Sequence, residues 1–233
     1  AYPIKIFADG ARLPDMLTFN RQPYIAGFTT NPTLMRADGV TDYQLFAREV
    51  LRAITAKPVS FEVFSDEFAE MRRQATLIAG WADNAWVKIP ITNTRGESAC
   101  PLIGDLARAG VKLNITALFT LEQVAAVLAA LPADAPAIIS IFGGRIADAG
   151  IDPCPLMAEA VRLARSHPRA EILWASPREV FNLVQAAQAG CHIITIANDI
   201  LKKLPNLGKD LTRFSLDTVQ MFYNDAQRAG YVL

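Results

Sequence analysis

A lysine lies inside an apolar stretch of the chain, where its amine could do covalent chemistry. Lys88 falls within residues 85–91, a short run rich in β-branched and aromatic side chains, so we predict a buried strand there. Burial of an ammonium group is costly and favours the uncharged amine, which is the form that attacks a carbonyl to make a Schiff base. A lone lysine in a strand is more often paired with a carboxylate or extended to water, so the rest of the chain must decide.

Polar residues recur at the ends of the other apolar runs. They are Asp9, Thr29, Asn31, Glu62, Asn114, Thr116, Ser140, Arg145, Ser176 and Arg178, with Phe142 among them. Asn114 and Thr116 are two residues apart, as are Ser140 and Phe142, so each pair faces one side of its strand. Each residue alone has a simpler role, because Asp9, for example, could cap a helix. Charged or amide groups at seven strand ends together favour a shared site.

Histidine and cysteine form no pattern of a metal site or a catalytic triad. His167 lies in a polar turn and His192 opens an apolar run, so we interpret both as structural. The three cysteines, Cys100, Cys154 and Cys191, are widely spaced and form no CxxC pair, which indicates neither zinc nor a disulfide framework. We therefore expect no metal site, and a reducing cytoplasm is the simplest setting. No cofactor is expected either.

The overall composition is typical of a well-buried globular enzyme. The 23 basic and 23 acidic side chains cancel, which leaves no electrostatic footprint for nucleic acid or an anionic membrane. No apolar run approaches the roughly 18 residues that span a bilayer. A hydrophobic content of 52% with 20% charged residues is typical of a well-buried globular enzyme and argues against disorder.

Short apolar runs recur eight times, with amphipathic stretches between them. The predicted strands are Pro3–Ala8, Tyr24–Phe28, Val59–Val63, Ala85–Ile89, Val111–Ile115, Ala137–Phe142, Glu171–Ala175 and His192–Ile196. Helical spacing is clearest at Thr41–Ala53 and Leu121–Leu131. Gly80, Gly110 and Gly190 each stand just after a helical stretch and before a strand, as helix stop signals do.

This alternation predicts an α/β fold. Eight strand–helix units in the chain average about 29 residues each, which suits a compact (β/α)8 (TIM) barrel, and we predict one such domain over residues 1–233. A doubly wound open sheet is the alternative, but the first strand is followed by Asp9-Gly10-Ala11 in place of a Gly-x-Gly-x-x-Gly loop. In a TIM barrel the carboxyl ends of the strands build the active site, so the polar residues would converge there.

A further helix is predicted at about residues 215–229, beyond what barrel closure needs. It carries Leu216, Val219, Met221, Phe222 and Tyr223. Such an apolar face would form a patch that monomers usually avoid. We expect it to pack on its own barrel or against another subunit.

Several segments together resemble the transaldolase family. They are GFTTNPT at residues 27–33, VKIPIT at 87–92, LNITALF at 113–119, SIFGGRI at 140–146 and ASPR at 175–178. With Asp9 they follow the family order and cover nearly the whole chain. The length is closer to the compact branch of the family, which includes fructose-6-phosphate aldolase, than to full-length transaldolases.

The resemblance implies a class I mechanism that needs no metal. Lys88 would form an imine with a ketose carbonyl, and the imine would accept the electrons released when the C3–C4 bond breaks. Glu62 and Thr116 would hold a water that shuttles protons, and Asp9 would accept the proton of the C4 hydroxyl.

The resemblance also implies a substrate-binding set, which comprises Thr29, Asn31, Asn114, Ser140, Phe142, Arg145, Ser176 and Arg178. The two asparagines and Ser140 would bind the dihydroxyacetone hydroxyls or orient Lys88. Arg145, Ser176 and Arg178 match the phosphate-binding residues of the family, and two guanidiniums with a hydroxyl suit a tetrahedral dianion. A surface salt bridge is the alternative role for either arginine.

Two positions bear on the reaction type. With a glutamate at Glu62 and a phenylalanine at Phe142, the chain resembles transaldolases. Fructose-6-phosphate aldolases carry a glutamine and a tyrosine at these two positions. A tyrosine hydroxyl would help to protonate and release free dihydroxyacetone, and phenylalanine cannot donate a proton. We therefore expect a transaldolase that moves dihydroxyacetone from a ketose with a terminal anion, such as fructose 6-phosphate, to an aldose phosphate. The alternatives are aldolase-type cleavage, a sulfosugar substrate, or a non-catalytic barrel that binds sugar phosphates.

Partners are expected to be the anionic ketose and further copies of the chain, with no nucleic acid and no membrane. The chain resembles compact members of the family, which form ring-shaped assemblies and exchange their C-terminal helices between subunits. The resemblance therefore implies a homo-oligomer, with a decamer of two pentameric rings as the specific expectation.

Overall fold

The eight predicted strands form one closed parallel barrel. A computed structural model describes residues 2–232, and within them the strands pair in sequence order from first to last and back to first. The strands are β1 (Lys5–Asp9), β2 (Ile25–Thr29), β3 (Val59–Glu62), β4 (Ala85–Pro90), β5 (Leu113–Leu118), β6 (Ala137–Ile141), β7 (Ala170–Trp174) and β8 (Ile193–Ala197). Every neighbouring pair is parallel. The predicted (β/α)8 barrel is confirmed.

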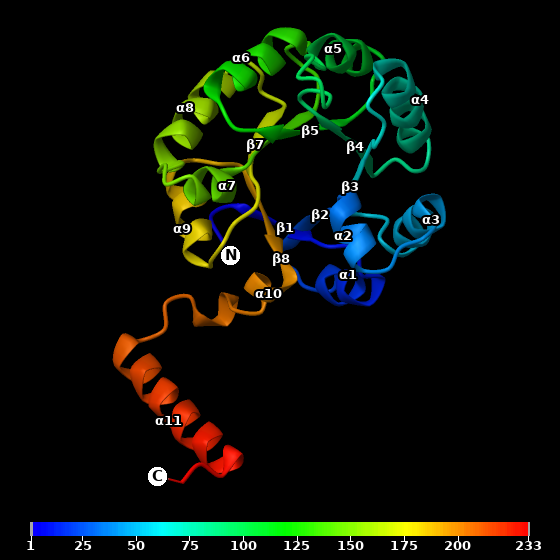
Figure 1. Ribbon diagram of the computed structural model, residues 1–233. Coiled ribbons are helices and arrows are strands. Elements are labelled where there is room, and N and C mark those ends of the chain that lie inside the picture. The colour runs from blue at the N-terminus through cyan, green and yellow to red at the C-terminus, as the bar shows by residue number, and fades with distance from the viewer. Residues whose placement is uncertain (1, 233) are drawn as a thin grey trace. The chain divides into compact units, whose positions relative to one another are not determined.

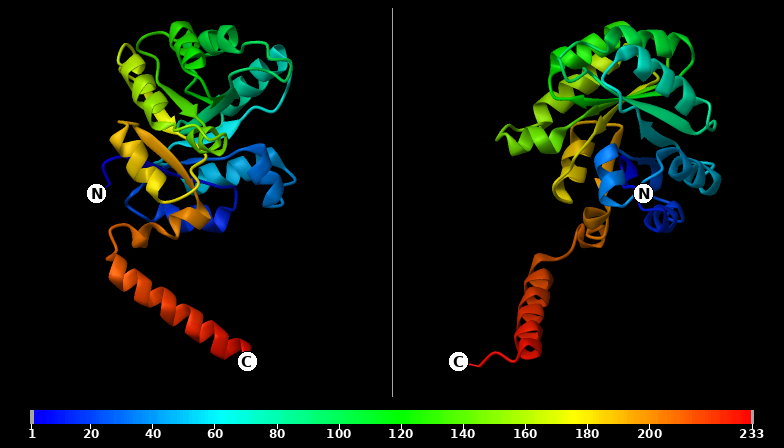
Figure 2. Two further views of the ribbon diagram at one scale, coloured as in Figure 1. Left: turned by 60° about the vertical axis from the view of Figure 1, so that its left-hand side comes forward. Right: turned by 45° about the vertical axis from the view of Figure 1, so that its right-hand side comes forward.

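Helices alternate with these strands and lie outside them (Figure 1; Figure 2). They are α1 (Leu13–Asn20), α2 (Pro32–Ala37), α3 (Tyr43–Ala53), α4 (Phe68–Ala79), α5 (Cys100–Arg108), α6 (Leu121–Ala130), α7 (Gly143–Asp148), α8 (Cys154–Ala164), α9 (Phe181–Gln188) and α10 (Asn198–Leu201). A capping box is present at the start of α6, where the side chains of Thr120 and Gln123 accept hydrogen bonds from each other's backbone N–H groups. This satisfies N–H groups that the first helical turn leaves free.

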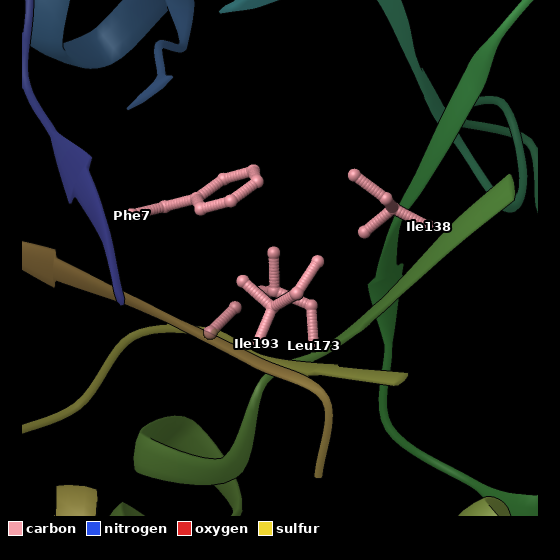
Figure 3. Packing of buried hydrophobic residues seen from close by; sticks show 5 residues of the cluster. Phe7, Ile138, Leu173 and Ile193 are labelled. Atoms are coloured by element: carbon pink, nitrogen blue, oxygen red, sulfur yellow. The ribbon is translucent and has the colours of Figure 1, made fainter. Parts of the chain in front are cut away.

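Inside the barrel, the lower part is filled by apolar side chains. Phe7, Ile138, Leu173, Ala175 and Ile193 form one buried cluster, and Figure 3 shows side chains from β1, β6, β7 and β8 converging on it. Because successive residues of a strand point to opposite faces, the residues two steps further along these strands also face inward. The cluster therefore forms a packed floor beneath whatever stands at the carboxyl ends.

Glycines let the chain approach closely at two points of the barrel. A Cβ on Gly27 would lie 2.6 Å from the ring of Phe7, so the missing side chain on β2 makes room for that ring. A Cβ on Gly144 would lie 1.5 Å from the backbone oxygen of Ser176. The start of α7 therefore rests directly on the segment that follows β7, and this brings Arg145 close to Ser176.

By its internal contacts the chain divides into a unit that ends at Leu201 and a second unit from Lys202 onward. The second unit contains a short 3-10 turn, Leu204–Asn206, and α11 (Leu211–Ala229). The prediction that this helix starts near residue 215 was wrong, because the side chain of Asp210 accepts a hydrogen bond from the backbone N–H of Arg213 and caps the helix one turn earlier. The single domain over residues 1–233 stays a prediction.

Two further properties of residues 2–232 concern membranes and metals. No helix among them combines the length and the apolar character needed to cross a membrane. No three or more histidine, cysteine, aspartate or glutamate side chains in that range are grouped so that they could hold a metal ion.

Candidate active site

A pocket of about 590 Å³ opens at the carboxyl ends of the strands. Ten of the twelve residues singled out from the sequence line it, namely Asp9, Thr29, Asn31, Glu62, Lys88, Thr116, Ser140, Phe142, Arg145 and Ser176. The other two, Asn114 and Arg178, are outside the lining. A larger pocket of about 790 Å³ lies at the amino ends of β1, β2, β7 and β8. We place the candidate site in the smaller pocket because buried charges and strained backbone collect there.

Lys88 lies in the wall of this pocket, with a side chain that is almost wholly buried. It is on β4, in register with Glu62 of β3 and Asn114 of β5, and only 7% of it is exposed. Its Nζ lies 3.4 Å from Glu62 Oε2 and donates to the backbone oxygen of Thr30 at 3.1 Å. The predicted buried strand is confirmed, and the amine meets both a carboxylate and the pocket.

Asp9 stands at the end of β1 and is held by a chain of hydroxyl groups. Thr29 Oγ1 donates to Asp9 Oδ1 at 2.7 Å, and Thr29 Oγ1 lies 2.5 Å from Thr195 Oγ1. Burial raises the pKa of Asp9, while the positive charge of Lys88 and the hydrogen bond from Thr29 act in the opposite direction. A carboxyl balanced in this way can take up and release a proton, as a general base must.

The donor and acceptor in each hydrogen bond of this series of hydroxyl groups follow from counting protons. When Asp9 is ionised, Thr29 gives its only hydroxyl proton to the carboxylate, so Thr195 must be the donor to Thr29. Thr195 also lines the pocket and was missed from the sequence. The signal for it was weak, because a threonine between isoleucines in β8 is equally typical of an ordinary strand.

A second polar chain lies beneath the pocket. Ser140 Oγ donates to Asn114 Oδ1 at 2.6 Å, and Asn114 Nδ2 donates to Ser60 Oγ at 3.1 Å. Asn114 is fully buried, so it supports the pocket wall through Ser140. The backbone oxygen of Ser60 accepts from Thr30 Oγ1 at 2.7 Å, which links this chain to the residue that bonds Lys88. Ser60 and Thr30 were not foreseen from the sequence.

Thr116 presents a hydroxyl that the protein does not satisfy. Its Oγ1 is buried and has no hydrogen-bond partner within the described part of the chain, although buried polar groups are rarely left unpaired. The next residue, Ala117, has a φ of 63°, a left-handed conformation that is costly for a residue with a Cβ. The carboxyl end of β5 therefore carries a free hydroxyl on strained backbone, and both residues line the pocket.

Glu62 is fixed from outside the pocket by a tyrosine that sequence reasoning missed. Tyr43, the first residue of α3, donates its hydroxyl to the backbone oxygen of Glu62 at 2.6 Å. Its ring packs on Phe64 and Trp81. Burial and the negative charge of Glu62 raise the pKa of Tyr43, so its hydroxyl keeps its proton and remains a donor.

Asn31 has a structural task in addition to lining the pocket. It is the N-cap of α2, and its Oδ1 accepts from the backbone N–H of Leu34 at 2.9 Å. The amide NH2 is the end of the side chain that could serve a ligand, since the oxygen is already used.

The pocket is also lined by Arg145, which brings a positive charge, and by a pair of aromatic rings. The Arg145 guanidinium carbon lies 5.8 Å from the centre of the Phe142 ring, and this ring packs on Phe119 at 5.6 Å between centroids. Ser176 stands beside them with a φ of 59°. A guanidinium and a hydroxyl on strained backbone suit a terminal anionic group.

Arg178, unlike Arg145, does not line the pocket. Its guanidinium binds both carboxylate oxygens of Asp148, with Nε 3.1 Å from each. Both side chains are about half exposed, at 50% and 52%. The surface salt bridge considered from the sequence is thus present, and a role of Arg178 toward substrate stays a prediction.

Comparison with known proteins shows the family of the chain. Residues 6–232 match the sequence profile of the family described as Transaldolase/Fructose-6-phosphate aldolase. A Dehalococcoides mccartyi protein named "Probable transaldolase" is 32% identical over 218 residues, which cover 92% of this chain and 97% of the relative. A Listeria monocytogenes protein named "Probable transaldolase 2" is 34% identical over 202 residues, covering 86% of this chain and 88% of the relative.

The fold comparison is broader than the sequence comparison. A solved structure from Burkholderia cenocepacia J2315 superposes with a TM-score of 0.58 at 14% identity, covering 99% of this chain and 85% of that one. Such a likeness shows the fold alone. The family profile, by contrast, spans the strands that carry Lys88, Glu62 and Asp9, and the chain therefore belongs to the transaldolase/fructose-6-phosphate aldolase family.

Proposed function

We propose that the protein transfers a dihydroxyacetone unit from a ketose with a terminal anion to an aldose phosphate, through a Schiff base on Lys88. The observation that carries the proposal is the buried Lys88 amine, 3.4 Å from Glu62 in the pocket that also contains Asp9. Lysine amines of this kind form covalent imines with carbonyl substrates, and the two carboxyls supply the proton transfers that imine formation and bond cleavage need.

Imine formation uses the Glu62 side of the pocket. The Lys88 amine in its neutral form attacks C2 of the ketose. The carbonyl oxygen takes up two protons, one of them lost by the amine nitrogen, and leaves as water. Glu62 and the unpartnered hydroxyl of Thr116 are the groups that we assign to this proton traffic, through a water held between them. The product is a protonated imine, which attracts electrons from the neighbouring carbon more strongly than a ketone does.

Cleavage uses the Asp9 side. Asp9 removes the proton of the C4 hydroxyl, the C4–O bond becomes a carbonyl, and the C3–C4 electron pair moves into the imine to give an enamine. The aldehyde fragment leaves and an aldose phosphate takes its place. The enamine carbon then attacks the acceptor carbonyl, Asp9 returns its proton to the new hydroxyl, and water releases the ketose from Lys88.

Terminal-anion binding is assigned to Arg145 and Ser176, which both line the pocket. A charge-assisted hydrogen bond from a guanidinium is stronger than one between neutral groups. Asn31 and Ser140, also in the lining, are assigned to the hydroxyls of the dihydroxyacetone part. The sugar is therefore held at both ends, which keeps its reacting carbons near Lys88.

Transfer is favoured over simple cleavage by the side chain at position 142. Phe142 lines the pocket and is packed between Phe119 and Arg145, and its ring offers no proton to the enamine. An enamine without a nearby donor persists until an aldehyde arrives. Aldolase-type cleavage is the second candidate, since the family description covers both activities.

The experiment is a panel of ketose donors, each with and without an aldose-phosphate acceptor. We expect fructose 6-phosphate to yield a new ketose phosphate only when erythrose 4-phosphate is present. Release of free dihydroxyacetone at the same rate without an acceptor would favour the aldolase. If the ketoses bind but no donor reacts, the barrel is a binding module and the proposal fails. The matched control is Lys88→Arg, which keeps the positive charge and cannot form the imine.

We also propose that the protein assembles as a homo-oligomer in the cytoplasm, with a decamer as the specific expectation. The support is α11, on which Leu216, Val219, Phe222 and Tyr223 are all exposed, an apolar face of a kind that usually marks an interaction surface. Light scattering of the full chain should give a mass near ten times 25.4 kDa. A mass of one chain would contradict the assembly.

A further inference from the structure

Asp148 is a carboxylate that pairs with Arg178 and that the proposed mechanism leaves unused. It is the last residue of α7, which also carries Arg145. Its two oxygens accept from Nε and Nη2 of Arg178. Those hydrogen bonds hold the pKa of Asp148 below its usual value, with a smaller contribution from the charge of Arg145. Asp148 is therefore ionised at neutral pH and acts on both arginines.

The ion pair between Asp148 and Arg178 affects how much positive charge is available to a ligand in the pocket. Arg145 and Ser176 line the pocket, and the guanidinium of Arg178 does not. Because one carboxylate offsets one of the two guanidiniums, the trio of Arg145, Arg178 and Asp148 carries one net positive charge. A terminal phosphate carries nearly two negative charges at neutral pH, so the trio does not match it in charge.

The main chain of Arg178 is fixed even though its side chain is engaged elsewhere. Its backbone N–H donates to Asn182 Oδ1 at 2.7 Å, and Asn182 Nδ2 donates in turn to Gln185 Oε1 at 2.8 Å. Asn182 is buried. A change of partner for the guanidinium therefore needs only side-chain rotation, and a half-exposed ion pair is weak enough for an anion to displace.

We propose that Asp148 is a specificity-determining residue that competes with the substrate anion for Arg178. It lowers the affinity of the site for a doubly charged phosphate more than for a singly charged group such as a sulfonate. The inference rests on the proposed function in one respect, namely that the substrate ends in an anion at this side of the pocket. It adds the charge class that the site discriminates and names the residue responsible.

The size of the discrimination follows from Coulomb's law. The repulsion between Asp148 and a bound anion is proportional to the charge of that anion. Neutralising Asp148 should therefore increase the logarithm of the affinity about twice as much for a dianion as for a monoanion of the same shape. The freed Arg178 adds attraction with the same dependence on charge.

The test compares methyl phosphate with methyl sulfate, which are tetrahedral esters of similar size. At pH 8 the first is a dianion and the second a monoanion. Dissociation constants would be measured by isothermal titration calorimetry on the full chain. In Asp148→Asn we expect the dissociation constant of methyl phosphate to fall about two- to fivefold, the range typical of one exposed ion pair. That of methyl sulfate should fall by about the square root of this factor.

Two outcomes would overturn the proposal. An unchanged or larger dissociation constant for methyl phosphate in Asp148→Asn would mean that Asp148 does not compete, or that it holds Arg178 in place for the anion. Equal changes for both esters would remove the discrimination by charge. Asp105→Asn is the matched control, because Asp105 pairs with Arg72 and Arg108 and contributes nothing to the lining of this pocket; it should leave both constants unchanged.

A second comparison tests whether Arg178 is the group at stake. In an Arg178→Ala background, Asp148→Asn should lose most of its effect on methyl phosphate. If the full effect persists, Asp148 acts by direct repulsion of the anion or through Arg145, and competition for Arg178 is wrong. These binding measurements need no imine, so their failure is separate from a failure of the transfer reaction, which the ketose panel reports.

Discussion

The two ends of the barrel interior differ sharply, although the same strands build both. On β1, Phe7 belongs to the apolar floor, and Asp9 lies two residues further on in the pocket. On β8 the same step leads from Ile193 to Thr195. Figure 3 shows the apolar end of this comparison. One strand period therefore separates the part of the interior that stabilises the fold from the part that does chemistry.

The contrast has an energetic meaning. The floor gains stability from apolar burial and close packing. The carboxyl end instead holds a buried lysine, an unpartnered threonine hydroxyl and two left-handed residues, Ala117 and Ser176. Each of these features costs free energy by itself. Such a cluster persists because the packed strands below hold it, and its concentration at one end is what marks a functional site.

The largest effect is expected at Lys88. Lys88→Arg and Lys88→Met should both lower turnover by at least about a thousandfold, because neither side chain can form the imine. Lys88→Arg keeps a cation beside Glu62, so it separates the loss of imine chemistry from the loss of charge. Steady-state kinetics and circular dichroism would be measured on both. A Lys88→Arg protein that still turns over would contradict the covalent mechanism.

At the apolar end of the barrel interior, a substitution should mainly change the stability of the fold. Phe7→Ala should lower the free energy of unfolding by about 3–5 kcal/mol, the usual range for removal of a buried phenylalanine. Urea denaturation would measure the change, with Ile151→Ala at an exposed position of the barrel unit expected to stay within about 0.5 kcal/mol of the parent. If Phe7→Ala is as stable as the parent, the floor does not support the site.

An intermediate effect is expected at Phe142, where a substitution would add a hydroxyl group to the pocket at the carboxyl ends of the strands. Phe142→Tyr should increase the ratio of dihydroxyacetone release to transfer about tenfold, roughly the value of one hydrogen bond to a charged or reactive group. The products would be quantified with and without an acceptor. Phe119→Tyr, on the neighbouring ring, is the control for a general change of polarity. A ratio that does not move would remove position 142 from the account of transfer.

The smallest effect concerns the hydroxyl chain behind Asp9. Thr195→Val removes the donor to Thr29 and weakens the bond that stabilises the Asp9 carboxylate, so the pKa of Asp9, already raised by burial, should rise further. A base is active above its pKa, and the acidic limb of the kcat/KM profile should therefore move to higher pH by a few tenths of a unit. Thr195→Ser should restore it. Movement to lower pH would contradict the inferred direction of the chain.

Much of the fold was predictable because the strands are apolar on both faces. All eight predicted strands overlap observed ones, and their ends differ by at most three residues, as at β5, which extends to Leu118. Pattern alone places an element better than its ends, since the last residues depend on pairing with neighbours. The start of α11 was misplaced as well, because it depends on the cap that the side chain of Asp210 provides.

Within the site, residues that are unusual for their surroundings were predictable and ordinary ones were not. Lys88 in an apolar strand and Asn114 in another draw attention in any sequence. Thr195 and Ser60 do not, because small hydroxyl residues are common in strands. Asp148 could not be assigned either, since its contact with Arg178 joins α7 to the segment after β7, two segments that Gly144 allows to approach closely.

The most direct test of the central claim is reductive trapping of the imine. The protein would be incubated with fructose 6-phosphate and sodium borohydride, and the adduct located by peptide mass mapping. We predict a single adduct on Lys88. Lys112 directly precedes β5, and its amine donates to the backbone oxygen of Asp83. It should remain unmodified. An adduct on Lys112, or none with any ketose that the enzyme turns over, would contradict the account.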